Sequence, residues 1–176
     1  MERIDHSAQI FKEAKMRVLL VTLVVLGLLA PQAALATTQV SEVIIIEGQK
    51  HSLSSLPLEQ YYKAGRSRPQ FRSPNTANRR GYLGIWEINQ GRLYLKGIRA
   101  WIGKEEVGPE ALFPGQKAPI PATWFTGKLR VPQGKVLRVG VPYPIHEKDL
   151  IITVEKGRVV RQEIVDNAGR VEPTKR

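Results

Sequence analysis

The sequence predicts a mostly β domain, either a single antiparallel β-sandwich or a partly open β-barrel, with at most one short helix. Two observations carry this prediction. Runs rich in β-branched and aromatic residues recur along the chain, and turns containing glycine or proline separate them. Only one short segment has the start and stop signals of a helix. About six to eight strands are expected from this spacing.

The clearest element is a β-hairpin over residues 79–101, in which two runs of aromatic and aliphatic residues flank Asn89-Gln90-Gly91. A three-residue loop would place Gly91 in the left-handed backbone region, where a side chain clashes. Both faces of the hairpin carry large apolar groups, so we expect both to be covered. With this three-residue loop, Trp86 lies opposite Tyr94, Gly84 opposite Lys96 and Tyr82 opposite Ile98. On the other face, Ile85 lies opposite Leu95.

Aromatic side chains mostly serve packing, so we expect those of the hairpin to lie in the core, with a ligand groove as the alternative. Gly84 lies between the aromatic residues Tyr82 and Trp86. Because glycine weakens a plain strand, Gly84 indicates a close approach of other atoms or a bend at this point.

The other elements follow in chain order. Residues 40–47 are β-branched at their centre and predict the first strand. Pro57 suits the first turn of a short helix over residues 58–64, and Gly65 suits the position after its end. Residues 103–121 are typical of a linker rich in proline and glycine. Two strands are expected at residues 124–132 and 136–141, with a turn at 132–135 between them. A second hairpin is expected over residues 150–154 and 158–165. Its turn at Lys156-Gly157 fits both two- and three-residue loops, so its register stays open.

The N-terminal region predicts an exported protein. Arg17, the apolar residues 18–30 and Ala34-Leu35-Ala36 have the order of a cleavable secretory signal peptide. The apolar run is shorter than the roughly 20 residues that span a bilayer, so no transmembrane segment is expected after cleavage. An uncleaved anchor is the alternative. Because residues 1–15 are polar, we expect translation to start at Met16.

Cleavage after Ala36 would leave a β domain over residues 37–166 and a polar tail over residues 167–176, in the periplasm or outside the cell. The 176 residues include no cysteine, which excludes disulfides, thiolate metal sites, cysteine nucleophiles and a lipid-anchored precursor. The net charge of +11 favours association with anionic partners. In the envelope these are anionic polymers and lipid headgroups rather than specific nucleic acid. The oligomeric state does not follow from the sequence.

The candidate binding site is the predicted loop at residues 66–80. This stretch has no apolar periodicity and no acidic residue, and it contains Pro69 and Pro74. Arginine pairs with phosphate and carboxylate through two hydrogen bonds, so we expect an anion-binding arm, with a solvated, mobile basic loop as the alternative. A competing interpretation places Arg79 or Arg80 inside the fold, paired with Glu87. The candidate anion-binding residues are Arg66, Arg68, Arg72, Arg79 and Arg80.

Catalytic and metal-binding templates are not met. The sequence lacks a nucleophile elbow, a Walker loop and a dinucleotide fingerprint. His146 has no second histidine nearby, and Glu105-Glu106 are adjacent in a linker rather than opposed around a substrate. No catalytic residue, metal or cofactor is therefore predicted. We expect a non-catalytic module that binds an anionic envelope component. The first alternative is a structural or partner-binding envelope protein that uses the aromatic hairpin or a sheet edge, and a hydrolase is the least favoured class.

Two motifs carry a resemblance to other proteins. One is the hairpin pattern R-G-Y, W-E-I and G-x-L-Y-L, which begins at Arg80, and the other is the pattern W-F-x-G-x-L-R-x-P-x-G, which begins at Trp124. Together they resemble an uncharacterised family of bacterial exported proteins, over roughly residues 48–165. The pattern is interrupted at Pro142 and Pro144. The resemblance implies no activity, cofactor or substrate.

Overall fold

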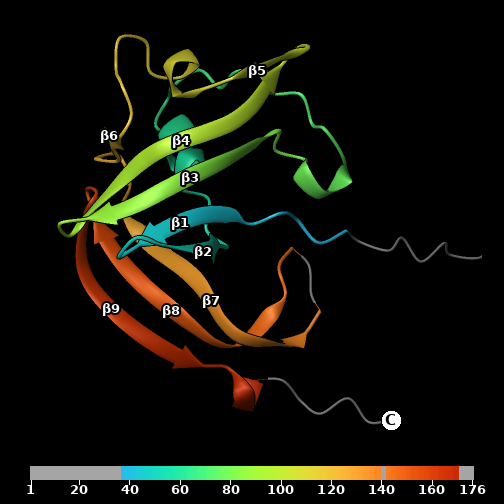
Figure 1. The fold of residues 1–176 in the computed structure, drawn as a ribbon, viewed down its shortest axis with the longest axis vertical. Coiled ribbons are helices and arrows are strands. Elements are labelled where there is room, and N and C mark those ends of the chain that lie inside the picture. The colour runs from blue at the N-terminus through green and yellow to red at the C-terminus, as the bar shows by residue number, and fades with distance from the viewer. Residues whose placement is uncertain (1–36, 140–141, 171–176) are drawn as a thin grey trace, which may run out of the picture. The chain divides into compact units, whose positions relative to one another are not determined.

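A computed structural model of the protein describes residues 37–139 and 142–170 (Figure 1). The predicted signal peptide and its cleavage motif, and the end of the polar tail, lie outside the described residues. The described part is mostly β, as expected: one mixed, mostly antiparallel, open sheet of nine strands with a single short α-helix. Two of the nine strands are only two or three residues long.

The strands in chain order are β1 Glu42–Ile46, β2 Gln49–Leu53, β3 Tyr82–Asn89, β4 Arg92–Ile102, β5 Glu105–Val107, β6 Ile120–Pro121, β7 Gly127–Arg138, β8 Ile145–Glu155 and β9 Arg158–Asp166. Helix α2 spans Pro57–Lys63, and short 3-10 turns cover Thr76–Asn78, Pro109–Ala111 and Ala168–Arg170. The predicted helix is confirmed, because Pro57 occupies its first turn and Gly65 follows its end with a φ of 82°.

The sheet has the strand order β2-β1-β3-β4-β9-β8-β7, with β5 and β6 paired to β4. All neighbours are antiparallel except β1 and β3, which run parallel. The antiparallel strand β2 returns the chain to the end of the sheet where β1 starts, and α2 and the loop at residues 66–80 then lead across to the start of β3. The two ends of the sheet approach each other, since the Ser54 N–H donates to the Arg130 carbonyl oxygen of β7 at 3.0 Å. Of the two predicted architectures, this approach favours the partly open barrel over the sandwich.

Three hairpins turn on two residues that both have positive φ, which are Glu47-Gly48, Gln90-Gly91 and Lys156-Gly157. Such turns match the twist of the adjoining strands. The three-residue loop predicted for the hairpin at residues 79–101 is therefore wrong, and so is its register. Trp86 pairs with Leu95 rather than with Tyr94.

A β-bulge shifts the β3–β4 register further, between Ile85 and Trp86. The shift pairs Tyr82 with Ala100 and Gly84 with Ile98, where the sequence predicted Ile98 and Lys96. A bulge adds one residue to one strand and bends it, and hydrophobic alternation alone does not reveal it.

The predicted turn at residues 132–135 is also absent, because β7 runs through it. A register shift between Gln133 and Val136 absorbs Gly134, whose φ is 76°, within the ladder to β8. The two strands predicted on either side of this turn are thus one bent strand. The linker predicted at residues 103–121 contains the short strands β5 and β6.

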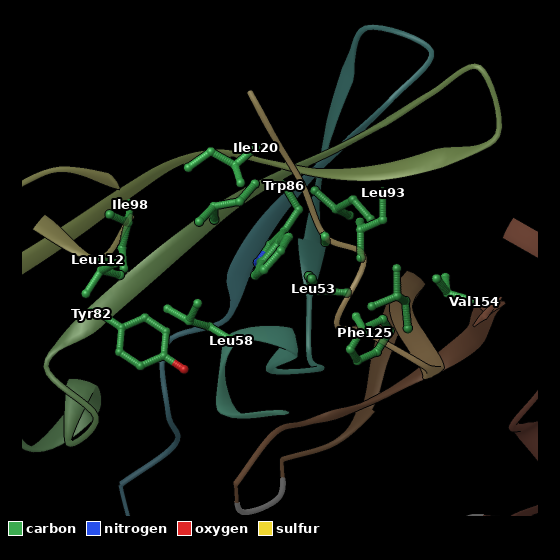
Figure 2. Packing of buried hydrophobic residues seen from close by; sticks show 14 of the residues in the cluster. Leu53, Leu58, Tyr82, Trp86, Leu93, Ile98, Leu112, Ile120, Phe125 and Val154 are labelled. Atoms are coloured by element: carbon green, nitrogen blue, oxygen red, sulfur yellow. The ribbon is translucent and has the colours of Figure 1, made fainter. Parts of the chain in front are cut away.

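The core lies between the strands and α2 (Figure 2). Figure 2 shows the Trp86 ring among side chains that come from separate strands, including Leu53 of β2 and Leu93 of β4. Trp86 and Tyr82 are fully buried, which confirms that these two hairpin aromatics serve packing, whereas Tyr94 and Trp101 are partly exposed. Burying one large apolar side chain contributes about 1.5–3 kcal/mol, so this cluster is the main source of stability.

Gly157 joins the two parts of the sheet. Its N–H donates to the Phe125 carbonyl oxygen at 2.9 Å, and its own carbonyl oxygen accepts from the Leu93 N–H at 2.8 Å. The Val159 N–H then donates to the Gly91 carbonyl oxygen at 2.8 Å. The turn between β8 and β9 is therefore bonded to the turn between β3 and β4.

Replacing Gly157 with alanine should destabilise the fold more than replacing Gly91. Both glycines have positive φ, 77° and 68°, so each substitution costs about 1–2 kcal/mol in backbone strain. A Cβ at Gly157 would also lie 2.8 Å from the Ala122 carbonyl oxygen, whereas nothing lies within 4 Å at Gly91. We expect a further loss of about 1–3 kcal/mol for Gly157→Ala in urea unfolding. Equal losses of unfolding free energy in the two variants would contradict the close contact between Gly157 and Ala122.

Candidate functional site

The structure divides the five arginines of the loop at residues 66–80 into two groups. Arg68 and Arg80 bind carboxylates of the fold. The other three, Arg66, Arg72 and Arg79, are exposed, and in the described part of the chain their side chains have no carboxylate partner. The five predicted residues therefore do not form one equivalent set.

Arg68 ties the loop to the helix and to β3. Its guanidinium donates to both carboxylate oxygens of Glu59 in α2, at 2.7 and 2.8 Å, and to the Arg80 carbonyl oxygen at 3.2 Å. Glu59 in turn accepts a hydrogen bond from the Tyr82 hydroxyl at 2.8 Å. The absence of acidic residues within the loop gave no sign of this partner, because Glu59 comes from the preceding helix.

Arg80 lies inside the fold, with only 8% of its side chain exposed. It donates to the Val40 carbonyl oxygen at 2.7 Å, and its Nε lies 3.7 Å from a carboxylate oxygen of Glu42 in β1. The competing interpretation is correct that Arg80 is internal but wrong about its partner, since Glu87 pairs with Lys96 at 2.7 Å. The parallel pairing of β1 with β3 brings Glu42 to this place.

The exposed arginines belong to a loop whose backbone is anchored. The Arg72 N–H donates to the Trp101 carbonyl oxygen at 2.7 Å, and the Arg79 N–H donates to the Gln39 side chain at 3.2 Å. The Arg66 guanidinium lies over the Tyr61 ring, 4.5 Å from its centre. The Arg72 and Arg79 side chains are thus presented from fixed backbone positions, and Arg66 is held by its contact with Tyr61.

Two further contacts hold the same loop. Phe71 forms an isolated β-bridge with Ile102 at the end of β4. The Asn75 side chain accepts hydrogen bonds from the Ala77 and Asn78 N–H groups at 3.0 Å, which caps the 3-10 turn. The segment is a bonded part of the domain rather than a free connection.

Glu42 is a fully buried carboxylate that sequence analysis missed. The Trp86 indole N–H donates to its Oε2 at 2.5 Å, and the Gly84 backbone also bonds to it. Removal from water raises the pKa of Glu42 to about 7, although the bonds from Trp86 and Gly84 and the charge of Arg80 act in the opposite direction. The one available signal was Gly84, whose position beside two aromatic residues indicated a close approach.

That close approach predicts the effect of a methyl group. A Cβ on Gly84 would lie 2.6 Å from the Trp86 Nε1 and 2.7 Å from the Glu42 Oε2. Gly97 in β4 is a matched control, because a Cβ there would meet only the Ile85 side chain at 3.6 Å or more. We expect Gly84→Ala to lower the free energy of unfolding by about 1–3 kcal/mol, and Gly97→Ala to change it little. Equal effects in urea denaturation would contradict the assigned contact.

The buried carboxyl also predicts a pH dependence. The folded chain holds the Glu42 proton up to a pKa of about 7, whereas the unfolded chain releases it near 4.5. The native state therefore binds more protons in this window, and stability falls as pH rises through it, by on the order of 3 kcal/mol, and levels off above it. Glu42→Gln should remove this slope in unfolding curves measured across the window. Parallel curves for both proteins would contradict the prediction.

A depression of about 500 Å³ lies on β7, β8 and β9. It contains Arg130 and Lys128, which flank the buried Leu129 and so point to the opposite face of the sheet. Arg130 and the buried Asn167 both donate to one carboxylate oxygen of Asp149, at 2.8 Å each. Because cations and acids alternate here, the depression is not matched to a polyanion.

The histidines and the paired glutamates of the described residues lie on different strands. His51 is in β2, His146 is in β8, and Glu106 of β5 pairs with Arg99 at 3.1 Å. Among the described residues, no three histidine, aspartate or glutamate side chains are grouped so that they could hold a metal ion. No helix within that part of the chain is long and apolar enough to cross a membrane.

Comparisons with protein-family models, with curated proteins and with solved structures give no match to this chain. The resemblance carried by the two motifs therefore contributes nothing to the proposed function. That function rests on the arrangement of the described residues alone.

Proposed function

We propose that the protein is a non-catalytic binding module for an anionic component of the cell envelope, which contacts Arg66, Arg72 and Arg79. The observation that carries this proposal is the division of the loop arginines. Arg68 pairs with Glu59, and Arg80 is buried beside Glu42. The remaining three are exposed and have no carboxylate partners among the described residues.

The physical chemistry of the loop supports this use. A guanidinium offers paired donors that match phosphate, sulfate and carboxylate groups, so three of them on one loop favour a repeating anion. Anchoring the backbone before binding lowers the entropy that is lost when the anion is bound. The net charge of +11 adds long-range attraction to the same class of partner.

The alternative classes are supported less. Tyr82 and Trp86 of the β3–β4 hairpin are fully buried, and Tyr94 and Trp101 are only partly exposed, so the hairpin offers a partner little aromatic surface. A sheet edge is the other surface for protein contacts. A hydrolase needs titratable groups that converge on an open cavity. Glu42, which has the raised pKa, is fully buried and faces Trp86 and Arg80 instead.

The test compares two triple variants with equal loss of charge. One replaces Arg66, Arg72 and Arg79 with glutamine, and Arg68 is left in place because it binds Glu59. The control replaces the exposed arginines Arg92, Arg138 and Arg158, which lie outside the loop. Retention on heparin and on vesicles with anionic lipid is measured at rising salt.

We expect the loop variant to elute at clearly lower salt than the control, with an unchanged melting temperature. The difference should shrink as salt rises, because exposed charge contacts are screened. A selective loss on heparin would indicate a polymer, and a selective loss on vesicles would indicate a lipid headgroup. If both triple variants lose equal retention, the basic surface acts only through its total charge and the proposed site is wrong.

A further inference from the structure

Strand β9 has a free edge along most of its length. One side pairs with β8 from Arg158 to Asp166. On the other side, β9 meets β4 only where Arg158 faces Arg92, and Figure 1 shows the two strands diverging from there. Within the described ranges, no strand pairs with the outer edge of residues 160–166. Unpaired edges are templates for pairing with another strand.

The exposed side chains of this edge are unusual for a surface that only faces water. Val160 and Ile164 are 52% and 65% exposed, and they flank Gln162, which is also exposed. Arg161 and Glu163 alternate with them and form an ion pair at 2.7 Å within the strand. The segment carries no lysine and no proline, two of the residues that blunt edge strands, although a bulge lies at its start.

The order of these residues is self-complementary. In an antiparallel pair of two such strands related by a two-fold axis at Gln162, Val160 lies opposite the partner's Ile164, and Arg161 lies opposite the partner's Glu163. Neighbouring two-fold registers lack this match. An axis at residue 161 places Arg161 opposite its own copy, and an axis at residue 163 does the same for Glu163, and directly opposed like charges are destabilising.

We propose that β9 is a homodimer interface, in which two copies of the chain pair antiparallel about Gln162 and join their sheets. The ion pair of Arg161 with Glu163 then becomes a cluster of four alternating charges, while Val160 and Ile164 cover each other. This is an isologous contact, in which the same surface serves both copies. Residues 160–166 hold one arginine and two acids, so the large positive charge of the chain is not concentrated here.

The other exposed apolar segment does not compete with β9. Val136 and Val139 are 51% and 79% exposed near the end of β7, but that strand leads directly into residues that the structure does not describe. Strand β2, at the opposite end of the sheet order, is followed by Ser54, which bonds to β7. The edge of β9 is therefore the surface on which the residues themselves specify a partner.

The first experiment uses the absence of cysteine from the chain. In the proposed register the two Gln162 residues face each other, and directly opposed Cα atoms in antiparallel strands lie roughly 4.5–5.5 Å apart. A disulfide accepts about 4.4–6.8 Å, so Gln162→Cys in the full chain should give a covalent dimer on mild oxidation. Val160→Cys and Ile164→Cys are matched controls that should not link alone, because each is two residues from the axis. The double variant of Val160 and Ile164 should link.

The second experiment tests the charge cluster by sedimentation of the full chain at several concentrations. In a dimer of Arg161→Glu, the new acid lies opposite the partner's Glu163, and in a dimer of Glu163→Arg the new cation lies opposite the partner's Arg161. Each variant alone should therefore have a dimer dissociation constant at least roughly tenfold higher than that of the wild type. A mixture of the two variants sets the acids of one copy opposite the cations of the other. We expect the mixture to form the dimer again. If the substitutions had weakened association only by damaging the fold of each variant, mixing them would not restore it.

Three results would overturn the proposal. The first is a wild-type chain that stays monomeric at all concentrations tested. The second is a Gln162→Cys protein that links no faster than the Val160→Cys control. The third is association that both single charge variants retain, which would place the contact elsewhere, for instance in the apolar residues 18–30. If the edge of β9 binds a peptide from an unrelated protein instead, the wild-type chain will stay monomeric.

Discussion

The structure depends on one buried carboxylate. Glu42 carries the cost of leaving water, and Trp86, Gly84 and Arg80 offset that cost from three different positions on the chain. A buried acid with these partners fixes the register of β1 against β3, because a shift of one residue would turn it to the other face. The central tryptophan of the core is oriented by the same hydrogen bond.

This arrangement also determines which arginines remain available. Arg80 is buried beside Glu42, and Arg68 is bound to the helix through Glu59, so these two cations of the loop serve the fold. The arginines that fix the loop to the fold, Arg68 and Arg80, are therefore different from those that the loop exposes to solvent. A charge count along the sequence does not separate the two groups, because the separation comes from acids on β1 and α2.

Local chemistry was predictable from the sequence and distant pairing was not. The glycine turns, the helix after Pro57 and the aromatic core follow from residues close to one another in the chain. The loop length at Gly91 was wrong because two- and three-residue turns accept similar residues, and only twist decides between them. Glu42 was missed because its role arises from a parallel contact with β3, which no short-range pattern encodes.

The parallel contact between β1 and β3 constrains the order in which the strands can pair while the chain is being synthesised. Strands β7, β8 and β9 are consecutive neighbours and can assemble from local contacts, but β1 can reach its inner neighbour only after the loop and the β3 segment exist. Until then the isoleucine run of β1 has only the short β2 beside it, and such segments are aggregation-prone. A chain that emerges amino end first passes through this state every time, so assistance from a chaperone would matter most before residue 90 has emerged.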